Sequence, residues 1–301
     1  MAWVRQGLLI EPSGLAPWIT SHAALPIAHP LDDRTHRVFI SARDDHNRAR
    51  IGYVDVELAR GRVTGVSDGP CLDLGELGTF DDSGVTGSCV VAHDGRLYLY
   101  YSGWSLGVTV PFYFYVGLAV SDDGGHSFQR VSKAPVLERN AIDPYLTASP
   151  SVLVENGVWR MWYVSCARWV LEGGQPKHYY HIRYAESRDG LHWDRRGHVA
   201  VDFQDDSEYA MARPCVRRDG DTYKMWFCAR GAAYRLAYAE STDGLSWRRL
   251  DEAVALDGPP GAWETEMQAY PEVLDHAGAR WMLYNGNGYG RSGVGLARLE
   301  S

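Results

Sequence analysis

The chain has 301 residues, enough for one large all-β domain or two ordinary domains. Its formal net charge of −8 argues against nucleic acid or an anionic membrane surface as a partner, because both require a basic face. No apolar run approaches the roughly 20 residues of a membrane-spanning helix, and no signal-peptide pattern precedes the first strand-like segment. We therefore expect a cytoplasmic protein that binds neither nucleic acid nor membrane.

The spacing of the cysteines and the lack of known metal-binding motifs favour a protein without a cofactor. The five cysteines are scattered singly, at positions 71, 89, 166, 215 and 228. An odd number with no C-x-x-C pair favours reduced thiols over a disulfide framework or a zinc site. The chain also lacks the H-E-x-x-H and EF-hand patterns. We expect no cofactor and assign no metal ligands, and the sequence leaves open whether an ion binds in the central channel.

Internal similarity predicts a repeated unit of antiparallel strands. Segments 117–131, 182–196 and 236–250 each hold an alternating strand, an Asp-Gly turn and then an aromatic residue. Asp-Gly supplies the positive φ angles of a tight hairpin turn. Two strand-like segments precede each of them, and partial copies of the unit occupy 22–58 and 268–300.

The number and length of these units predict an all-β fold, a five-bladed β-propeller in which each blade is a four-stranded antiparallel sheet. We expect the units to use the whole chain, 1–301, as one domain. The last unit has only three strands, and the segment 2–10 is left over at the N-terminus. We predict that this segment supplies the missing outer strand and closes the last blade.

Short sequence strings carry a resemblance to a known family. The strings are S-H-A at 21–23, L-G-T-F-D-D at 77–82, Y-Y-S-G-W at 100–104, M-W-Y at 161–163, A-R-P at 212–214 and Y-N-G-N-G at 284–288. The chain resembles the five-bladed propeller glycoside hydrolases, which include arabinanases, invertases, anhydrogalactosidases and mannoside phosphorylases. It is most similar to uncharacterised glycosidase-like members. The resemblance implies a sugar or oligosaccharide as ligand, and it is more specific for fold than for reaction.

Candidate acid and base groups lie in the loops that lead into the innermost strands. Glycoside hydrolysis requires two carboxyl groups, one to protonate the leaving oxygen and one to act at the anomeric carbon. The first unit carries His22 where the resemblance implies a catalytic aspartate, and imidazole can also transfer protons near neutral pH. The catalytic candidates are Asp82, Glu208 and His22, with Asp81, Asp143 and Glu266 in reserve.

Arginine and aromatic side chains near the same loops are candidates for substrate binding. An arginine fork binds carboxylate or phosphate in a bidentate manner. Two or more arginines left unpaired would indicate an anionic ligand, and Trp or Tyr rings stack on sugars. The binding candidates are Arg43, Arg168, Arg213, Arg230, Tyr145, Trp104, Tyr270 and Trp263.

The sequence leaves three functions open. The leading hypothesis is a carbohydrate-active hydrolase that cleaves or rearranges a glycosidic or related acetal bond by acid/base chemistry in a central pocket. The first alternative is a non-hydrolytic biosynthetic enzyme on the same scaffold, a cyclase, lyase or sugar transferase. The second is a carbohydrate-binding propeller without catalysis.

Overall fold

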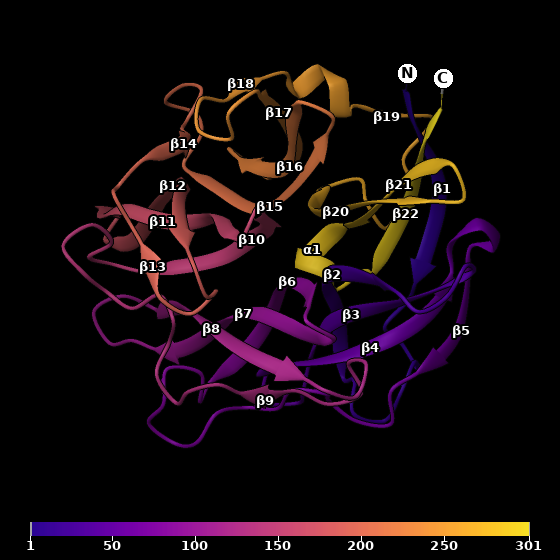
Figure 1. The fold of residues 1–301 in the computed structure, drawn as a ribbon, viewed down its shortest axis with the longest axis horizontal. Coiled ribbons are helices and arrows are strands. Elements are labelled where there is room, and N and C mark those ends of the chain that lie inside the picture. Colours follow the sequence, from indigo (N-terminus) through magenta and orange to yellow (C-terminus); the bar gives the residue numbers. More distant parts are fainter. Residues whose placement is uncertain (1, 301) are drawn as a thin grey trace.

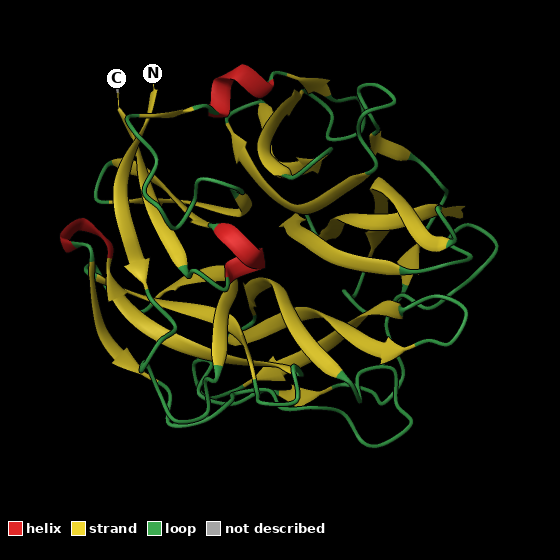
Figure 2. Cartoon of the chain, turned by 180° about the vertical axis from the view of Figure 1, so that it is seen from behind, coloured by secondary structure: helices red, strands yellow, loops and turns green. Residues whose placement is uncertain are grey.

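The computed structural model describes residues 2–300 and is built almost wholly of β-strands arranged around a centre (Figure 1). The helical α1 (Asn287–Gly290) lies close to that centre (Figure 2). Two 3-10 segments, η1 (Leu58–Arg60) and η2 (Asp251–Val254), lie between strands. Within residues 2–300, no helix has the length and apolar character needed to cross a membrane.

The first two sheets follow the order of the sequence. Each has four antiparallel strands, in the orders β2-β3-β4-β5 and β6-β7-β8-β9. The strands are β2 (Ser21–Pro30), β3 (Thr35–Arg43), β4 (Ala49–Glu57), β5 (Arg62–Val66), β6 (Gly84–His93), β7 (Arg96–Leu106), β8 (Phe112–Ser121) and β9 (Gln129–Arg130).

A nine-stranded sheet follows and consists of two antiparallel runs. The runs are joined by a single parallel bridge, between Tyr180 and Ala210. The first run has β10 (Thr147–Glu155), β11 (Val158–Glu172), β12 (Gln175–Ser187), β13 (Trp193–Asp194) and β14 (Val199–Val201). The second has β15 (Ala210–Asp219), β16 (Thr222–Arg230), β17 (Tyr234–Ser241) and β18 (Arg248–Arg249).

The last sheet joins the two ends of the polypeptide. Its order is β19-β1-β22-β21-β20, with the bounds β19 (Leu256–Asp257), β1 (Ala2–Ile10), β22 (Val294–Glu300), β21 (Ala279–Asn285) and β20 (Ala269–His276). Strand β1 pairs antiparallel with β22, from Ala2 opposite Glu300 to Ile10 opposite Val294. The predicted pairing of the N-terminal strand with the last unit is confirmed.

Ser-x-Asp-Gly sequences shape the turns after the third strand of several runs. In the turn after β12, Gly190 has a φ of 73°, a conformation that favours glycine. Its N–H donates to Ser187 Oγ at 2.9 Å, while Asp189 Oδ1 accepts the N–H groups of Leu191 and His192, both at 2.8 Å. Side chains thus satisfy the turn amides that no strand pairs.

The strands nearest the centre, β2, β6, β10, β15 and β20, share a bulge close to their first residues (Figure 1). In four of them the bulge holds a residue with positive φ that is followed by proline. These residues are Leu25, Ser149, Arg213 and Tyr270.

The bulges free backbone N–H groups, and side chains of neighbouring sheets accept several of them. The N–H of Gly87 donates to Ser41 Oγ at 3.0 Å, and the N–H of Ser149 donates to Ser102 Oγ at 2.9 Å. The N–H of Leu25 donates to Asn285 Oδ1 at 2.8 Å, across the junction between the first and last sheets. A buried N–H without a partner is costly, so these contacts fix how neighbouring sheets meet.

The apolar cores lie between neighbouring sheets. Val38, Ile40 and Val54 of the first sheet pack with Leu283 and Leu296 of the last sheet, and other clusters fill the remaining junctions. The strand tryptophans for which core packing is predicted are buried, as expected: Trp162, Trp226 and Trp281.

Asn285 is the polar link across the junction of the first and last sheets, and its loss is expected to destabilise the fold. It is fully buried, and its Nδ2 donates to the carbonyls of Ala23 at 2.7 Å and Gly293 at 2.8 Å. Asn285→Ala leaves three backbone groups unpaired, so we expect a loss of about 2–4 kcal/mol in the free energy of unfolding, measured in urea. Ser102→Ala, which removes one such contact at another junction, should cost less. An equal cost for both would contradict this role.

Candidate functional site

A cavity of about 310 Å³ opens at the end of the molecule where the central strands begin. Its wall is largely aromatic, with small hydroxyl side chains between the rings. The rings are Trp104, Phe112, Phe114, His178, Tyr180, Tyr234, Tyr270 and Tyr289. The hydroxyls are Ser41, Thr86, Ser102 and Ser149. A concave, mostly apolar site with a few polar groups is typical of small-molecule binding.

The charged residues that line this cavity, within residues 2–300, are Arg43 and Arg230. Arg43, the last residue of β3, donates from Nη1 to Asn47 Oδ1 at 2.7 Å and lies 6.0 Å from the Trp104 ring. Burial lowers the pKa of Arg43, but an arginine still carries its charge at neutral pH.

Arg230 is the last residue of β16 and lies among tyrosines. Its guanidinium carbon is 5.2 Å from the Tyr209 ring, 5.3 Å from Tyr234 and 5.5 Å from Tyr289. Among the described residues, no carboxylate lies within 4.0 Å of Arg230 or of Arg43. The cavity therefore presents two cations without protein counter-ions.

The tyrosines of the cavity are neutral hydrogen-bonding groups. The Tyr180 and Tyr234 hydroxyls are 3.1 Å apart. Burial raises the pKa of Tyr234 and of Tyr270 well above its usual value. At neutral pH these phenols keep their protons and can donate to a ligand oxygen.

Two histidines lie at or beside the cavity. His22 is 8% exposed, and its Nδ1 is 2.9 Å from Ser21 Oγ. Burial and then the charges of Arg43 and Arg291 lower the pKa of His22 to about 4. His178 stacks on Tyr180 with ring centroids 4.5 Å apart, and burial lowers its pKa to about 4. Both imidazoles are neutral at pH 7, and pKa values near 4 make them weak proton acceptors there.

The predicted carboxylates do not line the cavity, and several are engaged by arginines. Asp81 Oδ2 is 2.7 Å from Arg130 Nε and accepts the Tyr101 hydroxyl at 2.9 Å. Asp143, fully buried, is 3.1 Å from both Arg183 and Arg195. Its Oδ2 accepts the Tyr163 hydroxyl at 2.9 Å.

The same arrangement recurs in the other runs. Glu264 accepts the Tyr284 hydroxyl at 3.0 Å and is 3.1 Å from Arg5. In each of these three cases the tyrosine lies 20 residues beyond the carboxylate. Glu208 is held by both Nη atoms of Arg249, at 2.7 and 2.8 Å. The carboxylates at these equivalent places thus tie an entry loop to an arginine of the same sheet.

Two predicted acids carry no arginine. Asp82 Oδ2 accepts the Gly78 N–H at 3.0 Å, and its Oδ1 accepts the Ser83 hydroxyl at 2.7 Å. Glu266 is exposed, and its backbone N–H donates to Asn287 Oδ1 at 2.9 Å. Neither lines the cavity.

Of the predicted binding residues, the structure brings Arg43, Trp104, Arg230 and Tyr270 into the cavity wall. The others lie elsewhere. Arg168 is exposed over the Tyr179 ring, and Tyr145 is 38% exposed. Trp263 packs on Tyr284, with ring centroids 5.4 Å apart.

Arg213 has a structural environment instead of a place in the cavity wall. It is fully buried, donates from Nη2 to the Pro26 carbonyl at 2.7 Å, and forms an ion pair with Glu272 at 3.3 Å. Its positive φ of 55° at the bulge differs from the extended backbone of neighbouring strand residues. This conformation accompanies the contact with Pro26 on the first sheet.

Sequence reasoning missed much of the aromatic wall: Phe112, Phe114, His178, Tyr180 and Tyr234. These residues lie at the ends of β8, β12 and β17 that border the cavity. The alternation in F-Y-F-Y at 112–115 and H-Y-Y at 178–180 is a usable signal, because it places every second ring on one face of a strand.

Comparison with known proteins identifies relatives along the whole sequence. No family model matches it. It is 45% identical over 303 aligned positions to "Uncharacterized protein MT1551" of Mycobacterium tuberculosis (strain CDC 1551 / Oshkosh), and the match covers the full length of both proteins. "Uncharacterized protein Rv1502" of M. tuberculosis strain ATCC 25618 / H37Rv matches to the same extent. The protein belongs to the family of these two proteins.

Solved structures with a similar fold are glycoside hydrolases and related proteins. One described as "Glycoside hydrolase" has a TM-score of 0.76 at 15% identity, covering 99% of this chain and 92% of that one. The catalytic domain of the Coprinopsis cinerea GH62 α-L-arabinofuranosidase has a TM-score of 0.68 at 15% identity, covering 99% of this chain and 96% of that one.

A third similar structure concerns GH130 mannoside phosphorylases and hydrolases that target β-1,2 mannosidic linkages in Candida mannan. Its TM-score is 0.70 at 13% identity, covering 99% of this chain and 94% of that one. Identities this low establish the fold alone. The chain therefore has the fold of these glycoside hydrolase structures, as the sequence resemblance predicts.

The arginine contacts of Asp143 predict a structural cost for its neutralisation. Asp143→Asn leaves Arg183 and Arg195 without their shared counter-ion in a buried site. We expect the free energy of unfolding to fall by about 3–5 kcal/mol, measured by urea denaturation. Glu266→Gln, at an exposed and unpaired carboxylate, should change it by less than about 0.5 kcal/mol. A stable Asp143→Asn protein would show that the buried ion pairs are dispensable.

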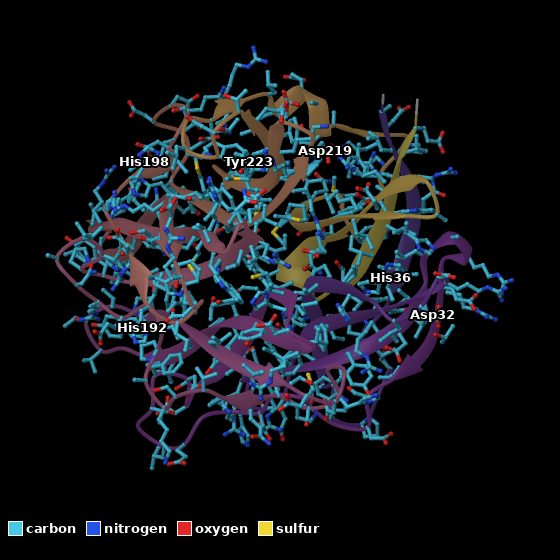
Figure 3. All side chains as sticks on the ribbon, in the orientation of Figure 1. Asp32, His36, His192, His198, Asp219 and Tyr223 are labelled. Carbon is cyan, nitrogen blue, oxygen red and sulfur yellow. The ribbon has the colours of Figure 1, made fainter. Side chains whose placement is uncertain are left out.

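The lowered pKa of His22 predicts a dependence of stability on pH. The unfolded state binds a proton at His22 below about pH 6.5, whereas the folded protein does so only near pH 4, so stability is lost as the pH falls between these values. In His22→Gln, the loss of unfolding free energy between pH 7 and pH 4 should be smaller by about 3 kcal/mol. The control is His192→Gln, because His192 is exposed and lies on the opposite side of the molecule from His36, as Figure 3 shows. An unchanged pH profile in His22→Gln would contradict the shift.

Proposed function

We propose that the protein is a carbohydrate-active enzyme whose central cavity binds a sugar bearing a carboxylate or phosphate group. The observation that carries the proposal is the pair of arginines, Arg43 and Arg230, in an aromatic cavity without a lining carboxylate among the described residues. A half-buried cation with no counter-ion favours an anionic ligand, and arginine matches planar carboxylate and phosphate oxygens. The aromatic rings provide faces for a sugar.

The composition of the cavity favours a reaction other than two-carboxylate hydrolysis. The predicted carboxylates lie outside the wall, and Asp81, Asp143, Glu208 and Glu264 are occupied by arginines. Among the lining residues, the groups left for proton transfer are His178, neutral at pH 7, and the tyrosine hydroxyls, whereas His22 lies outside the wall. Elimination or transfer on a charged sugar fits such a site, because arginine offsets the ligand charge while a neutral base accepts a proton.

We also infer that the strand runs beginning with β2, β6, β10, β15 and β20 are five blades of one propeller domain. The inference is supported by the shared bulge in these strands and by the pairing of β1 with β22. On this reading the single bridge between Tyr180 and Ala210 is a contact between two blades.

Charge selection in binding tests the proposal. We expect D-glucuronate or glucose 1-phosphate to bind with a measurable heat in calorimetry, and glucose at least tenfold more weakly. Arg43→Met and Arg230→Met keep the apolar stems and should each weaken the favoured anion about tenfold or more. Arg168→Met, at an exposed arginine outside the cavity, is the matched control.

Two results would reject the proposed ligand class. One is equal affinity for glucose and both anions. The other is an anion affinity that both cavity variants leave unchanged. Turnover is checked by ¹H NMR of uronate-containing oligosaccharides, in which elimination gives the vinyl proton of an unsaturated uronate, transfer gives a new glycosidic linkage, and hydrolysis gives only saturated products with a new reducing end.

A second candidate is a protein that binds the same anionic sugar without catalysis. The lack of a lining carboxylate, within residues 2–300, also suits this role. It predicts the same charge selection with no product, so the NMR assay separates the two.

A further inference from the structure

Two long hairpins rise beside the cavity and expose apolar side chains at their ends. The β7–β8 hairpin exposes Leu106 by 75% and leaves Val108 fully exposed, at 102%. The β11–β12 hairpin exposes Leu171 by 75%. The cavity-lining residues of β7, β8 and β12 lie toward these turns, so the turns stand on the cavity side of the molecule.

An aromatic surface connects these ends with the interior of the cavity. The Phe112 ring is 4.6 Å from Phe114, 5.6 Å from Trp169 and 5.7 Å from His178 by centroid. Phe112, Phe114 and His178 line the cavity, whereas Trp169 lies further along β11.

Strand alternation places two of the exposed side chains, Leu106 and Leu171, on this surface. Leu106 is two residues from Trp104 and pairs with Phe112 across the hairpin. Leu171 is two residues from Trp169, so each leucine shares the face of its aromatic neighbour. We call the surface formed by Leu106, Phe112, Trp169 and Leu171, together with the exposed Val108 in the turn after Leu106, the apolar strip.

Other sides of the cavity mouth are polar. The β3–β4 turn carries Asp44, Asp45, His46 and Asn47, and the segment between β21 and β22 carries Asn287, Arg291 and Ser292. The Arg43 guanidinium carbon, at the end of β3, is 6.0 Å from the Trp104 ring of β7, and Arg230 ends β16 in the same nine-stranded sheet as β11 and β12. The mouth therefore has a polar part, with charges of both signs, and an apolar part on the β7–β8 and β11–β12 hairpins.

We propose that the ligand is amphiphilic: an anionic sugar joined to an apolar chain or aglycone that lies along the apolar strip. This inference rests on the proposed anionic sugar site. A free sugar held inside the cavity would leave Leu106, Val108 and Leu171 in water. Scattered exposed apolar residues are common, but a strip continuous with a binding cavity indicates a bound apolar group.

The test compares ligands that differ only in alkyl length. The probes are methyl and hexyl β-D-glucuronide, and methyl and hexyl phosphate, titrated by calorimetry below any micelle-forming concentration. Each buried methylene strengthens binding about fourfold, so burial of three of the additional methylenes predicts an advantage of about 60-fold for the hexyl member of the pair that binds.

The matched variants separate the strip from the anion site. Leu106→Ser/Val108→Ser should reduce the hexyl advantage to below about tenfold while leaving the methyl ligand unchanged. Leu31→Ser is the control, because Leu31 is a 42% exposed leucine in the turn after β2, at the end of that strand remote from the cavity.

Each other outcome overturns the inference in a distinguishable way. Equal affinity for the methyl and hexyl members rejects the amphiphile and leaves the anionic sugar site standing. No binding by any of the four probes rejects both. A third outcome would assign the strip to a bilayer surface instead. In that case the wild type, but not the double variant, would bind phosphatidylcholine vesicles, and alkyl length would have no effect on affinity in solution.

Discussion

The buried pairing of carboxylates with arginines and tyrosines in the entry loops is the interaction on which the rest of the site depends. Asp143 and Glu264 each lose nearly all contact with water, a cost that arginine pairs and tyrosine hydroxyls must offset. The arginine and the tyrosine offset this desolvation cost only when the entry loop and the arginine are fixed in the positions that bring their charged groups into contact. The carboxylates of these loops therefore stabilise the fold instead of lining the cavity. The charged residues that do line the cavity, Arg43 and Arg230, are positive.

The protein shares its fold with solved glycoside hydrolase structures. The similar fold explains where the cavity lies, because the central strands of the sheets begin around it. It does not determine the chemistry, which depends on the residues at the wall. Here the wall combines Arg43, Arg230 and neutral tyrosines with an apolar strip that continues outward. These features favour a charged headgroup and an apolar extension in one ligand.

The strands and the Asp-Gly turns are predictable because they follow from local sequence periodicity. The pairing of the N-terminal segment is predictable because the last repeat unit lacks one strand. The roles of the carboxylates are harder to predict. Asp81, Asp143 and Glu264 recur at equivalent places, which suggests convergence on a pocket, yet recurrence in a repeat also marks a repeated structural task. Their partners, such as Arg130 and Arg195, lie 49 and 52 residues away, so the sequence shows neither pairing. Arg43 and Arg230 can be identified as candidates from the sequence. Whether a carboxylate pairs with them is decided by three-dimensional contacts, which the sequence does not show.

The most direct test of the central claim is the anomalous difference map of a crystal soaked in tungstate, a tetrahedral anion with strong scattering. The account predicts a peak inside the aromatic cavity, within hydrogen-bonding distance of the Arg43 or the Arg230 guanidinium. An empty cavity, with tungstate bound only at exposed cations such as Arg168, would contradict the claim that the cavity is built for an anion.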